Sequence, residues 1–193
     1  ATVRFDLTPA GFHAFILSAG GTIYIDPIQP GNDRHYQSYY KRDLRSDKVF
    51  GGCTVVDEDG MAAEIQRLVA AGLQGSGSQL RTYRAAVAAT GEYTAFHGGT
   101  VAKGLAAVVT SMNRVDAVYE KEVSIRMVLV ANNNLIIYTN SSTDPYTNNN
   151  GNTMLGQNQT TLDAVIGTAN YDIGHVFSTG GGGIAGLGVV CRA

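Results

Sequence analysis

The sequence contains no tryptophan, and its 193 residues include only two cysteines, four prolines and four histidines. Two cysteines, Cys53 and Cys191, exclude a disulfide framework and leave open either one bridge or two separate partners. No histidine stands three or four residues from another histidine, a cysteine or a candidate ligand carboxylate on one helix. Packing or capping is therefore the default interpretation of each histidine.

Charge is also scarce. Charged residues make up 16 % of the chain and leave a net charge of −2, which argues against a dedicated nucleic-acid-binding protein. The longest apolar run, residues 184–190, is far shorter than a bilayer-spanning helix, and Gly186 and Gly188 interrupt it. No segment joins a basic start to an apolar stretch, so we expect that any signal peptide was removed or never existed.

Glycine and apolar residues are plentiful, at 24 residues and 44 %. Alternating apolar and polar residues predict a strand at residues 3–7, and β-rich runs predict strands at residues 12–17 and 22–28. Aromatic residues suited to a half-buried face predict a further strand at residues 36–41. Apolar residues at three- and four-residue spacing then predict a helix over residues 59–73. A Gly/Ser stretch follows this helix, and we place a domain boundary there. The predicted parts are residues 1–75, a linker at 76–80, and residues 81–193.

The second part has the pattern of an α/β (α+β) fold. It predicts strands at residues 83–89, 124–130, 135–138 and 186–191, and helices at 100–120 and 160–168. The second helix would be capped by Thr160 or Thr161, after a long polar loop at residues 139–158.

No catalytic constellation emerges from the residues alone. The four glycines at 180–183 lack the following Gly-Lys-Ser/Thr of a phosphate-binding loop, so a flexible connector is the better interpretation. Residues 75–78 do not fit the G-x-S-x-G pattern of a serine hydrolase. The acidic residues at 57–59 begin like a calcium loop, but the later ligands of that loop are missing.

Several segments, taken in order, carry a resemblance to a known family. They are residues 84–93, 113–115 with 118–120, 143–147, 170–177 and 184–191. Residues 81–191 thereby resemble the first part of a reprolysin-like zinc metallopeptidase, a metzincin, of the secreted bacterial type. Residues 1–75 then resemble the end of a propeptide, with activation cleavage between Gly72 and Arg81. The implied fold is a β-rich propeptide followed by the upper subdomain of the catalytic domain, a mixed twisted sheet with two main helices.

The resemblance implies zinc held by three histidines of H-E-x-x-H-x-x-G-x-x-H, whose glutamate activates a metal-bound water. The sequence contains no such motif, and no histidine follows His175. The family carries that helix a little beyond the position of Cys191. We therefore expect the chain as given to be inactive, with no catalytic or metal-binding residue of its own, in front of a zinc helix that lies outside it.

The resemblance also assigns roles to individual residues. Gly186, Leu187, Gly188 and Val189 match the family's edge strand, which pairs with an extended substrate; an interior strand rich in glycine is the alternative. Cys53 resembles a cysteine switch that would occupy the open zinc position, with a disulfide or a free thiol as alternatives. Cys191 resembles a family cysteine that bonds to a later partner.

Calcium gains little support from the resemblance, because Arg84 stands nearest to the family's ligand glutamate, although Asp144 matches a second ligand position. The expected partner is a peptide or protein substrate, with no nucleic acid and no membrane span, in a secreted or cell-surface protein. The oligomeric state stays open. The competing hypothesis is a non-catalytic extracellular binding module on the same scaffold, and a hydrolase with an unassembled site is a third.

Overall fold

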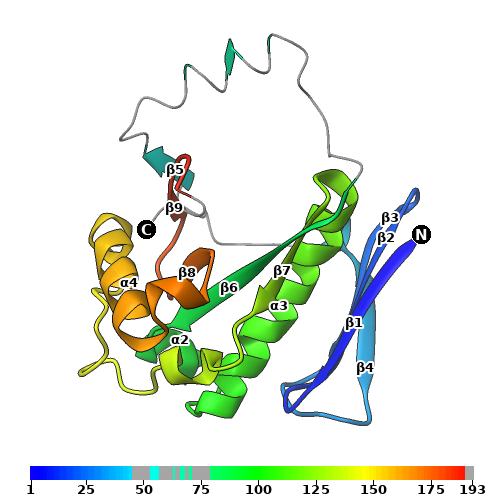
Figure 1. Cartoon of the computed structure of the whole chain (residues 1–193). Coiled ribbons are helices and arrows are strands. Elements are labelled where there is room, and N and C mark those ends of the chain that lie inside the picture. Colours follow the sequence, from blue (N-terminus) through cyan, green and yellow to red (C-terminus); the bar gives the residue numbers. More distant parts are fainter. Residues whose placement is uncertain (45–52, 57–62, 64–65, 68–69, 71–78, 190–193) are drawn as a thin grey trace.

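The computed structural model describes residues 1–44, 53–56, 63, 66–67, 70 and 79–189. Two sheets flank one long helix, α3 (Val101–Glu122), as Figure 1 shows. The N-terminal sheet is an antiparallel meander, and the second sheet is parallel with the order β7-β6-β8. The α+β fold class predicted from the sequence is confirmed. No described helix is long and apolar enough to cross a membrane.

The N-terminal sheet contains the four strands that the sequence predicts. They are β1 (Thr2–Thr8), β2 (Gly11–Ser18), β3 (Gly21–Pro27) and β4 (Tyr36–Tyr40), followed by the short helix η1 (Lys41–Asp43). Two-residue turns join β1 to β2 and β2 to β3 and place Thr8 opposite Gly11 and Ser18 opposite Gly21. Both glycines have a positive φ, which a residue with a Cβ atom adopts only with strain.

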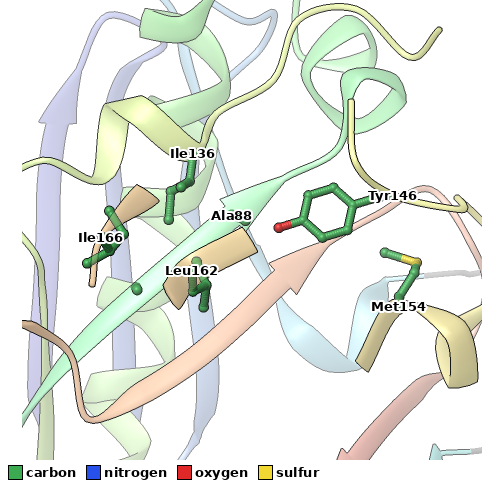
Figure 2. Close-up of a cluster of buried hydrophobic side chains, with 7 residues drawn as sticks. Ala88, Ile136, Tyr146, Met154, Leu162 and Ile166 are labelled. Carbon is green, nitrogen blue, oxygen red and sulfur yellow. The ribbon is translucent and has the colours of Figure 1, made fainter. Parts of the chain in front are cut away.

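The parallel sheet is built around β6 (Arg81–Ala89), which lies between β7 (Ile125–Leu129) and β8 (Ile173–Phe177). Its alanine-rich half is buried on both faces. Ala86 and Ala88 face helix α4 (Gly151–Val165), whereas Ala85, Val87 and Ala89 face α3. Figure 2 shows the α4 side, where Ile136, Tyr146, Met154, Leu162 and Ile166 close over Ala88. Small residues on β6 let the two helical layers approach closely.

Helix α3 is the helix predicted at residues 100–120. Thr100 caps it by accepting the backbone N–H of Lys103 at 3.3 Å. Val108 and Met112 face the parallel sheet and are buried. Asp116 accepts the N–H of Met127 at 2.9 Å near the start of β7, and burial raises the pKa of this carboxyl.

Two expectations from the sequence are wrong between β7 and β8. Residues 135–138 do not form a strand: Asn133–Ile136 is a 3₁₀ helix, η2, followed by a single bridge between Ile137 and Ala89. Helix α4 begins at Gly151, inside the segment expected to be a loop, and its cap is Asn150 rather than Thr160 or Thr161.

Polar side chains on the buried side of α4 explain the second error. Asn158 and Thr161 are buried there together with Met154 and Leu162. Polar residues therefore interrupt the repeat of apolar residues by which a helix is predicted. Asn158 accepts a hydrogen bond from the Tyr146 hydroxyl at 3.0 Å. The hydroxyl of Thr160 donates to the carbonyl of Gly156 within the helix, so Thr160 lies inside α4 and not at its start. Short helices η3 (Thr168–Asn170) and α2 (Gly91–Phe96) complete this part.

The N-terminal sheet contacts α3 through the face that carries Asp6 and Asp26. Asp6 accepts from the Thr110 hydroxyl at 2.8 Å and from Asn113 Nδ2 at 3.2 Å, and it lies 3.1 Å from His13 Nδ1. Arg114 forms an ion pair with Asp26. These contacts make the junction between the two parts of the chain polar and directional.

Two further residues extend this junction. The hydroxyl of Tyr39 donates to Asp26 at 2.5 Å, and burial together with this bond raises the pKa of Tyr39 to about 12. Glu120 binds Arg126 and Arg4, and these cations lower the pKa of the Glu120 carboxyl, Arg126 contributing most. The charge pairs thus join β1, α3 and β7.

Replacing Asp6 with alanine is expected to loosen the N-terminal sheet from α3. Thr110, Asn113 and His13 would all lose their acceptor in a half-buried place, which costs about 2–3 kcal/mol of the free energy of unfolding. Denaturant unfolding measures this loss, and hydrogen exchange locates it in β1 and β2. Asp33→Ala, at an exposed position, is the control. Equal stability of the two variants would contradict the prediction.

Candidate functional site

The candidate site is strand β9 (Gly183–Gly186) together with the segments that hold it. β9 follows β8 through a turn that contains Gly182, whose φ is +87°. The connector was expected at residues 180–183 and covers residues 178–182, since β8 ends at Phe177 and Gly183 already belongs to β9. The strand itself was expected at residues 186–191 and lies earlier in the chain.

Loop residue Asn148 fixes the start of this turn. Its Nδ2 donates to the Thr179 hydroxyl at 2.8 Å, while its Oδ1 accepts from the N–H of Thr179 at 3.3 Å and from the Thr90 hydroxyl at 3.2 Å. One amide therefore connects the end of β6, the loop before α4 and the approach to β9. The sequence analysis missed Asn148, and its only signal was the high asparagine content of residues 139–158.

Strand β9 packs against the first residue of helix α4, Gly151. A Cβ atom on Gly151 would lie 2.8 Å from Cδ1 of Ile184 and 3.0 Å from its Cγ1. The absence of a side chain at the first residue of α4 therefore lets Ile184 pack directly against the helix. This contact sets the distance between β9 and α4.

Strand β5 (Cys53–Val56), from the part of the chain expected to be a propeptide, pairs with β9 in parallel. The register places Cys53 opposite Gly183 and Val56 opposite Gly186. Figure 1 shows the two strands side by side, apart from the parallel sheet. The side chain of Cys53 lies outside the described residues, so its role as a cysteine switch stays a prediction.

The four residues predicted to bind substrate lie at the end of this strand. Gly186 is the last residue of β9, Leu187 and Gly188 form a turn, and Val189 follows with 53 % of its surface exposed. Gly188, in this turn, has a φ of +69°, so the backbone does not continue as an extended strand after β9. The side chain of Val189 folds back over Gly186: a Cβ atom on Gly186 would lie 2.8 Å from Cγ1 of Val189. Cys191 lies outside the described residues.

A family model described as reprolysin-like metallopeptidases of family M12B matches residues 79–193, more than half of the chain. The chain belongs to this family. No curated protein and no solved structure matches the chain. The match covers β6–β9, α2, α3 and α4, and β5 and the N-terminal sheet lie outside it.

The two positions considered for calcium in the reprolysin-like region make other bonds. Arg84 donates to both carboxylate oxygens of Asp172, at 2.7 Å and 3.1 Å, and to the carbonyl of Ala169. The bonds from Arg84 lower the pKa of the Asp172 carboxyl. Asp144 accepts the backbone N–H groups of Gly91 and Tyr146, at 2.7 Å and 2.9 Å. Asp144 therefore serves to hold the loop before α4 onto the start of α2.

Histidines of the reprolysin-like region lie in aromatic contacts. His97 packs on Tyr93 with ring centres 4.5 Å apart, and His175 packs on Phe177 at 4.8 Å. Burial lowers the pKa of His97. Within the residues that the structure describes, no three His, Cys, Asp or Glu side chains gather in a group that could hold a metal ion.

Proposed function

We propose that this chain is the front portion of a secreted, zinc-dependent endopeptidase precursor in which residues 1–75 act as the pro-segment. The pairing of β5 with β9 is the observation that carries the proposal. An extended peptide binds a protease of this kind by adding its backbone to an exposed strand edge. In the structure, β5 from outside the matched region uses the hydrogen-bonding groups of β9 for the same kind of pairing. The pro-segment would thereby exclude substrate from this strand.

Catalytic zinc does not fit the residues of this chain. The described residues contain no cluster of metal ligands, and the 193-residue sequence contains no H-E-x-x-H segment. No step of peptide hydrolysis is therefore assigned to a residue of this chain. The zinc ligands of the proposed enzyme would come from chain outside these 193 residues, and the substrate class is peptides and proteins.

A non-catalytic binding module on the same scaffold, with β9 as its binding strand, is the second candidate. The coding DNA beyond the codon for Ala193 distinguishes the two. If H-E-x-x-H-x-x-G-x-x-H follows in frame, the peptidase proposal stands. A stop codon or an unrelated sequence would remove it and leave β9 as a binding strand.

Activity measurements give the biochemical prediction. With zinc added, the 193-residue chain is expected to leave casein uncut, because it carries no ligand set for the metal. The longer gene product is expected to cut casein after removal of the pro-segment, to lose this activity with a zinc chelator and to regain it with zinc. Zinc-dependent cleavage by the 193-residue chain would contradict the assignment of the ligands. A longer product that stays inactive after removal of the pro-segment would contradict the proposed function.

A further inference from the structure

The N-terminal sheet, β1–β4, shares neither strand pairing nor an apolar core with the rest of the described chain. Its four strands pair only with one another, in the order β1-β2-β3-β4. The two clusters of buried apolar side chains lie among residues 85–177, and no side chain of β1–β4 belongs to either cluster. Separating this sheet from the rest of the described residues would therefore break no strand pairing and open neither core cluster.

Charged side chains connect the sheet to α3, beside which it lies in Figure 1. Arg4 pairs with Glu120, and Asp26 pairs with Arg114; the four side chains are between 17 % and 26 % exposed. The sheet supplies the cation of the first pair and the anion of the second, so the two pairs together fix one orientation of the sheet on the helix. Asp6 adds two hydrogen bonds from α3.

The aromatic side chains on this face of the sheet pack mainly on one another. Phe15 is 5 % exposed, and its ring lies 5.2 Å from the ring of Tyr24 in the same sheet. Tyr24 in turn stacks on Tyr39, with ring centres 5.5 Å apart. The guanidinium of Arg114 lies over the Tyr24 ring, 4.9 Å from its centre, and contributes a cation–π contact from α3. Arg114 therefore binds the sheet through both Asp26 and Tyr24.

We propose that this junction is a separable interface: after cleavage between Gly72 and Arg81, the N-terminal piece stays bound to α3 without a covalent link and leaves when salt weakens the charge pairs. The partner that α3 recognises is thus the cleaved N-terminal sheet of this chain. The same piece carries β5, so β9 would stay covered until the sheet leaves, because a ladder of four residues is too short to persist by itself. The role in activation rests on the proposed function, whereas the binding of the two pieces does not.

Salt dependence distinguishes this interface from an apolar one. Ions screen charges over a distance of about 10 Å at 0.1 M salt and about 3 Å at 1 M salt. Attraction between the charges of the sheet and those of α3 therefore falls steeply over this range, whereas the burial of apolar surface is not weakened by it. We expect the dissociation constant of the two pieces to rise at least about 10-fold between 0.1 M and 1 M sodium chloride.

Cutting the folded 193-residue chain at one inserted bond tests the proposal. The recognition sequence of a specific protease is inserted between Gly77 and Ser78, inside the segment predicted to be cleaved. Sedimentation velocity of the cut chain over a range of concentrations gives the dissociation constant at each salt concentration. The pieces are expected to sediment together in 0.1 M sodium chloride and to separate in 1 M. Pieces that are already apart in 0.1 M, or that bind as tightly in 1 M, would overturn the proposal.

A pair of variants on α3 locates the effect. Arg114→Met removes the ion pair with Asp26 and the cation over Tyr24, so the cut chain is expected to dissociate at least about 10-fold more readily in 0.1 M sodium chloride. Lys103→Met is the matched control: it removes the same charge from α3, but Lys103 is exposed and lies against Gly98. Equal dissociation of the two variants would overturn the proposal. None of these measurements needs peptidase activity, so they test the interface separately from the proposed function.

Discussion

Replacing Asn133 with leucine is expected to lower the free energy of unfolding by about 2–5 kcal/mol. Asn133 Oδ1 accepts the N–H of Val87 at 2.8 Å, and its Nδ2 donates to the carbonyl of the same residue at 2.9 Å. Both residues are almost completely buried. β7 pairs with β6 only as far as Ala85, so the Asn133 amide continues the ladder where the neighbouring strand has ended. Leucine would leave a backbone donor and a backbone acceptor buried without partners.

Denaturant unfolding followed by circular dichroism measures this effect. Asn134→Leu is the matched control, since Asn134 is the next residue and is exposed. The control is expected to change the free energy of unfolding by less than about 0.5 kcal/mol. If both leucine variants unfold at the same denaturant concentration, the hydrogen bonds to Val87 do not stabilise the fold.

Replacing Gly91 with alanine is expected to cost about 3 kcal/mol of the free energy of unfolding, through overpacking. A Cβ atom at this position would lie 2.2 Å from the backbone nitrogen of Ser141 and 2.5 Å from the carbonyl carbon of Asn140. Backbone cannot rotate away as a flexible side chain does. The same loop is held to Gly91 by the bond from its N–H to Asp144, so the clash would break that bond as well.

Gly156→Ala in α4 provides the contrast. Nothing lies within 4 Å of a Cβ atom at Gly156, and alanine in a helix interior is about 0.5–1 kcal/mol more favourable than glycine. Thermal unfolding should therefore show opposite shifts for the two variants, downward for Gly91→Ala and upward for Gly156→Ala. A Gly91→Ala variant as stable as the wild-type chain would mean that residues 140–141 do not rest on this glycine.

Local patterns predicted those elements whose environment is simple. Alternation located β1, and β-rich or aromatic runs located β2, β3 and β4, because each of these strands pairs with its neighbour in the chain. The apolar period located α3, whose side toward the parallel sheet carries Val108 and Met112. Short continuous apolar runs located β6 and β7. In each case a residue's burial follows from its place in a regular local repeat.

The errors arose where polar side chains are buried or where distant segments meet. Asn133 replaces a strand partner, so the apolar residues after it form a 3₁₀ helix instead of a strand. Asn158 interrupts the apolar period of α4 because Tyr146 supplies its hydrogen bond. The pairing of β5 with β9 joins segments far apart in the chain, and no local pattern encodes it. The candidate site depends most on these non-local contacts. The family could be predicted without them, because the resemblance rests on sequence segments alone.

The connectivity of the two sheets also determines the order in which they can assemble. Every contact within the β1–β4 meander is between neighbouring strands, so this sheet can form as soon as its last strand leaves the ribosome. The ladder between β5 and β9 requires residues on both sides of α3, β7, α4 and β8. Closing so long a loop carries a large entropy cost before any bond is made. During synthesis β5 therefore remains unpaired until β9 has left the ribosome, long after the β1–β4 sheet can form.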